Sequence, residues 1–227
     1  MFVDKNGTIP ESLEEAAQWL RQIVDKINNA SNTTATALFN YHYTNKNANI
    51  NTYINGQANN SVASLKLGIS EVKDVGCESV AIHNAMIATY DVHNFRDVLY
   101  KCESIKLAGG LLGCNPYEIG QVLHAFNHEY NATMNTDNIN NIISYGRVFI
   151  ISFWNADKWA DRLDINGKNP GLHTVAFRKN DDGTYTAWNV YNSQANAKYY
   201  DTFDDLKEAT YRKNNNFIVL YSLVEEA

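Results

Sequence analysis

The stretch GLHTVAFRKNDDGTYTAWNVYN, residues 171–192, decides the fold of the second half of the chain. Two runs rich in β-branched and aromatic residues flank a polar segment that contains Asp182 and Gly183. Runs of this composition form strands, and an Asp-Gly pair between them is typical of a hairpin turn. The stretch therefore predicts two antiparallel strands that lie side by side.

Further strands surround this hairpin. RVFIISFW at residues 147–154 and FIVLYSLV at residues 217–224 are continuous apolar runs of strand length. Helical patterns occupy the first half of the chain, with Asn94 and Asn115 as expected N-caps of two helices. Because the helices come first and the strands later, the sequence indicates an α+β fold, with an antiparallel sheet packed on helices.

The chain divides by composition near residue 62. Residues 1–62 are expected to form an amphipathic helix at 10–29 followed by an Asn-rich extended arm, with a candidate strand at 37–43. Residues 63–227 contain the remaining helical and strand patterns. They are expected to form one domain with a core of its own.

The bulk composition argues against several classes of protein. A net charge of −6 and the lack of any Lys and Arg run give no support for nucleic-acid binding. No apolar stretch is long enough for a bilayer, so no membrane span is expected. The N-terminus lacks the basic start and apolar run of a secretory signal, which favours a cytoplasmic protein or an excised piece of an exported one. Three cysteines cannot form a disulfide framework.

Cys77 lies at the start of an apolar helical pattern in DVGCESVAIHNAMIATY, residues 74–90. Backbone N–H groups in the first turn of a helix lack partners, and the helix dipole favours an anion there. A thiol in this position can lower its pKa from about 8.5 to roughly 3.5–7.5 and become a nucleophilic thiolate. The alternative interpretation is that Cys77 is a small buried side chain without chemistry.

His173 lies near the start of the first hairpin strand, and an asparagine is expected opposite it. A two-residue turn pairs residues 181 and 184 and places Asn192 across from His173. A five-residue loop pairs residues 178 and 184 and places Asn189 there instead. In either register an asparagine amide can fix the imidazole tautomer and aim the other ring nitrogen at a nucleophile.

A cysteine at a helix start, a histidine on a later strand and an asparagine on the next strand resemble papain-like cysteine peptidases. The segments DVGCESVAIHNAM and GLHTVAFRKNDDGTYTAWNVYNS are similar to the bacteriocin-leader (double-glycine) peptidase group, over roughly residues 70–192. The resemblance implies a papain-like fold, with the Cys helix packed on the sheet. It also implies hydrolysis of a peptide or protein substrate through a thioester. By this resemblance Cys77 is the nucleophile, His173 the base and later the acid, and Asn189 the orienting residue, with Asn192 second.

Glu71 departs from the pattern of that family. Such peptidases usually carry a glutamine six residues before the cysteine, and its amide donates to the oxyanion of the reaction intermediate. Here that position holds Glu71. An ionised carboxylate repels an oxyanion, and loss of one donor typically costs about 10²–10³ in rate. We expect burial beside the site to raise the pKa of Glu71, so that the protonated carboxyl can donate.

Other candidates for chemistry are weaker. Cys114 also precedes a helix but does not begin an apolar one, and Cys102 is expected to be structural. His124 and His128 have the i, i+4 spacing of a zinc clamp, but Ala125 stands where a metalloprotease needs a glutamate. No metal or cofactor is therefore expected.

Two further functions share the papain-like resemblance. One is acyl or amide transfer, as in a deamidase or transglutaminase-type effector or toxin domain. The other is peptide binding by a non-catalytic relative, for which Glu71 would be the mark.

Overall fold

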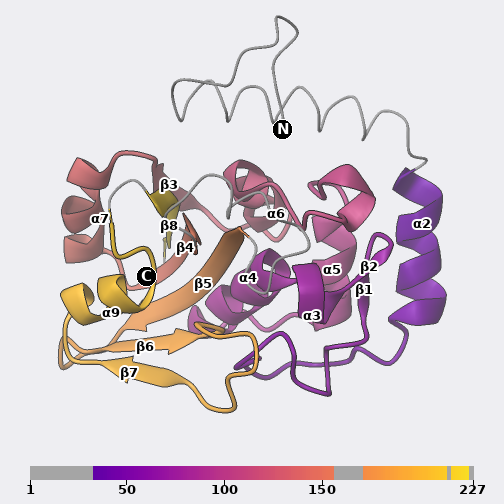
Figure 1. Ribbon diagram of the computed structural model, residues 1–227, viewed down its shortest axis with the longest axis horizontal. Helices are drawn as coiled ribbons and strands as arrows, with labels where there is room; N and C mark the ends of the chain where they lie inside the picture. Colours follow the sequence, from indigo (N-terminus) through magenta and orange to yellow (C-terminus); the bar gives the residue numbers. More distant parts are fainter. Residues whose placement is uncertain (1–32, 156–170, 214–215, 225–227) are drawn as a thin grey trace, which may run out of the picture.

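The computed structural model describes residues 33–155, 171–213 and 216–224, and its centre is a six-stranded antiparallel sheet (Figure 1). Across the sheet the strands follow the order β3 (Tyr130–Thr133), β8 (Phe217–Leu223), β4 (Val148–Trp154), β5 (Leu172–Lys179), β6 (Tyr185–Trp188) and β7 (Lys198–Tyr200). The α+β class and the four predicted strands are confirmed. The amphipathic helix expected at 10–29 lies outside the described residues.

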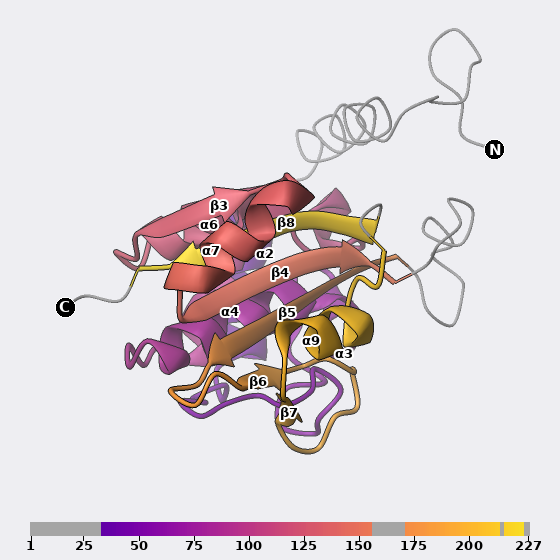
Figure 2. The same ribbon diagram turned by 90° about the vertical axis from the view of Figure 1, so that its left-hand side faces the viewer.

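Helices cover both faces of this sheet (Figure 2). One face packs against α4 (Cys77–Ala88), α5 (Phe95–Cys102) and α6 (Ile119–His124). The other face packs against α7 (Ile139–Tyr145) and α9 (Phe203–Ala209). The sheet therefore separates two hydrophobic cores, which we call the α4 core and the α7–α9 core. The sides of the sheet that they cover are the α4 face and the α7–α9 face.

Alternation along the central strands divides their side chains between these cores. On β5, Ala176 lies in the α4 core, whereas Val175 and Phe177 lie in the α7–α9 core. Thr174 lies on the same face of β5 as Ala176, and its hydroxyl forms a hydrogen bond with Ser152 Oγ at 2.9 Å. His173 falls in the opposite row, and its ring meets Phe153 of the α7–α9 core edge-on, with 5.7 Å between ring centroids.

Helix α4 is buried on every side and begins at Cys77, as the sequence predicted. All its residues except Ile87 are buried, which suits a helix between the sheet and α5. Asn84 fastens the preceding chain to α4, because its side-chain amide accepts from the N–H of Ile54 and donates to the carbonyl of the same residue, both at 2.8 Å. Residues of the expected arm, among them Ile54 and Val62, thus contribute to the α4 core.

The strand expected at 37–43 was wrong, because this segment is helical. It forms α2 (Thr33–Phe39) and continues as the single π-turn η1 (Asn40–Thr44). Phe39 and Tyr43 stack at i, i+4 spacing, with 5.3 Å between centroids. Asn40 is buried and donates to the Gly68 carbonyl at 2.7 Å and to Glu103 at 3.0 Å. Side-chain anchoring at helical spacing outweighs the strand propensity of the aromatic residues.

Short elements connect these parts. They are β1 (Lys66–Leu67), β2 (Ser70–Glu71), α3 (Val72–Val75), η2 (Ala108–Gly110), η3 (Pro116–Glu118) and η4 (Thr136–Asn138). Asn115 caps η3 by accepting from the N–H of Tyr117, as its expected N-cap role requires.

Both expected registers of the β5–β6 hairpin were wrong. Lys179 pairs with Tyr185, and Asn180 closes the loop through its N–H to the Thr184 carbonyl at 2.8 Å. Asp182 supports this turn by accepting from the N–H and hydroxyl of Thr184. Strand β6 ends at Trp188, because Asn189 has a φ of 60° and leaves the extended conformation.

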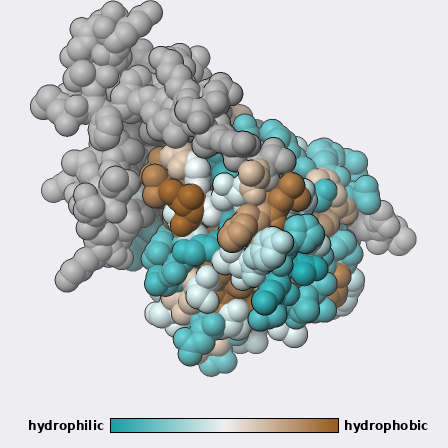
Figure 3. All heavy atoms as spheres, turned by 90° about the vertical axis from the view of Figure 1, so that its right-hand side faces the viewer, coloured by the Kyte–Doolittle hydropathy of each residue, from teal (hydrophilic) through white to brown (hydrophobic). Residues whose placement is uncertain are grey.

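Exposed apolar side chains gather on the face that carries α2 (Figure 3). Phe39, Ile69 and Leu111 are each about three-fifths exposed. Within the described ranges, every helix is too short or too polar to cross a membrane.

Candidate active site

Cys77 is the first residue of α4, and its sulfur lies against the backbone of β5. The side chain is 6% exposed. Peptide N–H groups of Thr174 and Glu78 face the sulfur and favour its anion. Burial and the neighbouring Glu78 carboxyl act more strongly in the other direction, so the pKa of the Cys77 thiol is raised well above its usual value. The expectation of a lowered thiol pKa was therefore wrong for this conformation.

Glu78 is the group that holds the thiol. Its Oε2 accepts from Cys77 Sγ at 3.3 Å and lies 3.5 Å from the peptide N–H of Cys114. The residue is 1% exposed, and burial raises the pKa of its carboxyl to about 7. Sequence reasoning missed Glu78. The signal was a charged residue in the first turn of a helix whose later residues are mostly apolar.

Two further thiols lie behind Glu78. Cys114 and Cys102 are fully buried, and Cys114 Sγ lies 3.7 Å from the Cys102 carbonyl. The side chain of Cys102 and burial raise the pKa of the Cys114 thiol. Cys102 belongs to the α4 core, in line with the structural role expected of it. Neither thiol has the partial exposure of Cys77.

His173 and Asn189 are brought together, but through the backbone of the asparagine. The imidazole Nε2 lies 2.6 Å from the Asn189 carbonyl, which fixes this nitrogen as the N–H donor. Burial lowers the pKa of His173, so the ring is neutral near pH 7. The Asn189 amide is turned to Gln57, accepting from its N–H at 2.9 Å and donating to its Oε1 at 3.2 Å. Gln57 was missed, because it lies in the Asn-rich segment without a local motif.

The Cys77 side chain lies near the backbone of β5 beside His173, and within the described residues it does not contact the imidazole through a hydrogen bond. The N–H that faces the Cys77 sulfur belongs to Thr174, and its nitrogen is covalently bonded to the carbonyl carbon of His173. The imidazole leaves β5 on the α7–α9 face, toward Phe153 and Asn189. Among the described residues, no hydrogen bond joins the thiol to the imidazole.

In the described part of the chain, no hydrogen bond joins Asn192 to His173. Its carbonyl accepts from the N–H of Ala58 at 2.8 Å, so it ties the loop after β6 to the segment around residue 57. This follows from the observed register and from the turn at Asn189. Of the two asparagines considered, the structure places Asn189 beside the imidazole.

Glu71 lies outside the buried cluster. Its carboxylate bonds to Lys73 Nζ at 2.5 Å and to Lys66 Nζ at 3.4 Å, and its side chain is 31% exposed. The hydrogen bond and charge of Lys73, with help from Lys66, lower the pKa of Glu71. The expectation that burial raises this pKa was wrong, because two lysines hold the carboxylate at the surface.

The His124 and His128 side chains also point to separate partners. His128 Nε2 bonds to Asp91 Oδ2 at 3.0 Å, and His124 lies 4.0 Å from Glu129. His, Cys, Asp and Glu side chains in the described ranges form no group of three or more that could hold a metal ion.

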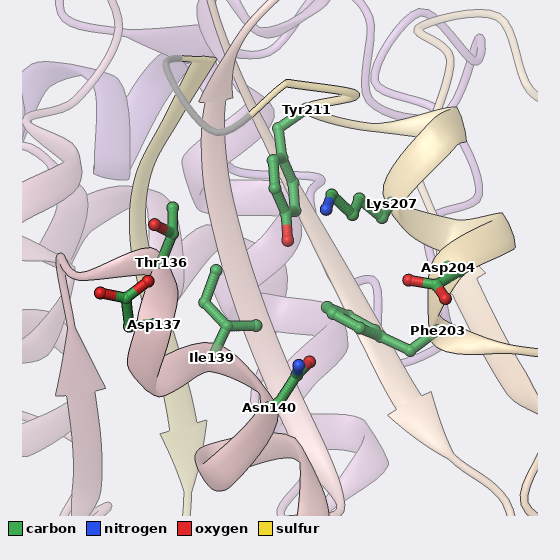
Figure 4. Close-up of a pocket in the computed structure, with 8 residues that line it drawn as sticks. All are labelled: Thr136, Asp137, Ile139, Asn140, Phe203, Asp204, Lys207 and Tyr211. Atoms are coloured by element: carbon green, nitrogen blue, oxygen red, sulfur yellow. The ribbon is translucent and has the colours of Figure 1, made fainter.

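A pocket of about 340 Å³ lies on the far side of the sheet from Cys77, between α7 and α9 (Figure 4). Asp137, Asp204, Lys207 and Tyr211 are among its lining residues. It opens on the α7–α9 face and includes no residue of the cysteine cluster.

Comparison with protein-family models and with curated proteins gives no match to this chain. The chemistry of the cluster around Cys77 therefore carries the functional inference.

Proposed function

We propose that this protein is a cysteine hydrolase of papain-like type that cleaves peptide bonds through a thioester on Cys77. In this proposal His173 serves as base and later as acid, and Asn189 orients its ring. The orienting contact is the backbone carbonyl of Asn189, with the side chain holding that carbonyl in place through Gln57.

One observation supports the proposal above the others. The sulfur of Cys77 lies at the first turn of a buried helix and faces the N–H groups of Glu78 and Thr174. These donors stabilise negative charge, both on a thiolate and on an oxyanion formed beside it. Because the N–H of Thr174 faces the sulfur, Cys77 lies next to the peptide bond that joins His173 to Thr174. The proposal requires the imidazole to turn toward the sulfur when substrate binds, because in this structure it leaves β5 on the α7–α9 face.

A non-catalytic peptide-binding protein is the second candidate function. The raised pKa of the Cys77 thiol favours it, because a thiol that stays protonated is a poor nucleophile. Acyl or amide transfer is a third outcome on the same thioester, and the products distinguish it from hydrolysis.

The test is to trap an acyl group on Cys77. The protein is incubated with a mixture of short peptides, quenched in acid and digested, and the cysteine peptides are examined by mass spectrometry. We expect an acyl adduct on Cys77, with peptide fragments in solution; ammonia release without fragments would indicate deamidation. An adduct on Cys114 would contradict the proposal, and so would the lack of any adduct over a broad peptide mixture.

A further inference from the structure

The Glu78 carboxyl is buried beside the Cys77 thiol, and its two oxygens are hydrogen-bonded unequally. Oε2 meets the Cys77 thiol and the Cys114 N–H. Oε1 is buried and has no hydrogen-bond partner among the described residues. A buried polar atom without a partner costs folding free energy, so its presence needs an explanation. A structural carboxylate would have both oxygens bonded or a cation beside it.

The loop that contains Gly113 packs closely against the Glu78 carboxyl. Gly113 has a φ of 73°, and a Cβ built on it would lie 3.1 Å from Glu78 Oε2 and 3.0 Å from the Val75 carbonyl. The loop before Cys114 therefore lies close against Glu78, with little room for a side chain at position 113.

The titratable groups around Glu78 are few. They are Cys77 of α4, Cys114 in the loop after η2 and Cys102 of α5 behind it. On β5, next to His173, the hydroxyl of Thr174 does not titrate, but it faces the Glu78 carboxyl and favours its ionised form. Among the groups that shift Glu78, no Lys or Arg compensates a carboxylate charge. Negative charges on the Cys77 sulfur and on Glu78 Oε2 would lie 3.3 Å apart in a low dielectric, which disfavours the doubly ionised pair.

We propose that Cys77 and Glu78 act as a thiol–carboxyl dyad that shares one proton, with Glu78 as the group that accepts the proton of the thiol. The inference rests on the proposed hydrolase function and deepens it, because it assigns to Glu78 the proton transfers that the family resemblance gave to His173. In the step proposed, the S–H bond breaks and the proton moves to Glu78 Oε2. The sulfur electron pair then forms the C–S bond to the substrate carbonyl carbon, and the C=O π pair moves to oxygen.

The later steps balance in the same way. When the tetrahedral adduct collapses, the oxyanion pair re-forms C=O, the C–N bond breaks and the departing amine takes the proton from Glu78. Water attacks the thioester and loses a proton to the Glu78 carboxylate, and the C–S bond breaks to return the thiolate. Glu78 then gives its proton back to the sulfur.

The dyad predicts an unusual pH dependence for Cys77. Loss of the first proton gives mostly carboxylate with thiol, plus a fixed small share of thiolate with carboxylic acid. Once the dyad has lost that proton, the thiolate share stays constant with pH. A lone thiol far below its pKa gains about ten-fold in thiolate with each pH unit.

The experiment measures the rate at which iodoacetamide alkylates Cys77, by peptide mapping from pH 5 to 9. With the carboxyl pKa at about 7, wild-type protein should gain only roughly two-fold between pH 7 and pH 8. Glu78→Gln keeps the size and polarity of the side chain but cannot titrate, so its rate should gain about ten-fold over the same interval. Glu208→Gln, a matched change on the exposed face of α9, should follow wild type.

A second control tests whether the flattening of the alkylation rate above pH 7 comes from the Glu78 carboxyl or from the His173 imidazole. His173→Ala should keep the flattening near pH 7. If His173→Ala loses the flattening while Glu78→Gln keeps it, the imidazole is the acceptor and the proposal is overturned. A wild-type rate that rises ten-fold per unit through pH 8 overturns it as well, even where Glu78→Gln fails to fold. Because alkylation needs no substrate, a flattened profile without any acyl adduct removes the hydrolase function and leaves the dyad.

Discussion

Glu71 and Glu78 are carboxyl residues seven positions apart, on either side of the short helix α3, and they behave in opposite ways. Glu71 is part-exposed and held by two lysines, which lower its pKa. Glu78 is buried beside a thiol, and burial raises its pKa to about 7. The sign of the shift follows from the surroundings, because nearby cations favour the carboxylate and a low dielectric favours the acid.

The difference teaches where a proton can be exchanged at neutral pH. Glu71 stays ionised throughout the physiological range and acts as a surface ion-pair partner. Glu78 titrates in that range and touches a nucleophilic atom. A reactive carboxyl of this chain is therefore expected at the start of α4, and not at the position that the family resemblance singled out.

The largest effect on activity is expected when the Cys77 sulfur, which lies beside Glu78 but not beside Glu71, is removed. Cys77→Ala should reduce acyl-adduct formation and peptide cleavage by on the order of 10⁴-fold or more, since it deletes the nucleophile. The circular dichroism spectrum should be unchanged, because little volume is lost. Cys102→Ala, a change in the α4 core, is the control and should keep activity. Turnover retained in Cys77→Ala but lost in Cys114→Ala would contradict the assignment.

The next effect is a loss of unfolding free energy with rising pH, caused by Glu78. Glu78 has a folded-state pKa raised from 4.5 to about 7, so its contribution is fully present below pH 4.5 and is lost as pH rises through 7. Over that window wild-type protein should lose about 3 kcal/mol of unfolding free energy through Glu78. Glu78→Gln has no such loss. Urea unfolding of both proteins should therefore show the variant gaining on wild type from pH 5 to pH 8; a constant difference would refute the shift.

A smaller effect separates backbone from side chain at Asn189. Asn189→Gly keeps the carbonyl that meets His173 and tolerates the φ of 60°, but it loses both bonds to Gln57. We expect a loss of about 1–3 kcal/mol in unfolding free energy and a fall in rate of about ten-fold or less. Asn189→Ala should be less stable than Asn189→Gly, because alanine is strained at positive φ. A loss of activity in Asn189→Gly as complete as in His173→Ala would mean that the side chain orients the ring.

The smallest effect is expected at Glu71. Glu71→Gln removes the two surface ion pairs with Lys66 and Lys73, and such pairs contribute little. The pH profile of kcat/KM on one peptide should stay as in wild type. A variant that is faster near neutrality would show that Glu71 reaches the oxyanion after all, and would remove the contrast with Glu78.

The sequence predicted those features that depend on local pattern. Apolar runs located β4, β5 and β8, and the apolar helical pattern of residues 74–90 placed Cys77 at a helix start. The hairpin register could not be read from the turn residues, because Asn180 and Asp182 close the loop through side-chain bonds. The Glu78 contact with Cys114 joins residues 36 apart, and the Gln57 contact with Asn189 joins residues 132 apart. Contacts of such separation are set by packing and leave no local signal.

The most direct measurement is the order in which the three thiols react in the native protein. We predict that iodoacetamide at pH 8 labels Cys77 alone, and that Cys102 and Cys114, both fully buried, react only after unfolding. Peptide mapping after a time course gives the order without any knowledge of the substrate. Labelling of Cys114 before Cys77, or equal labelling of all three in the folded protein, would contradict the assignment of chemistry to Cys77.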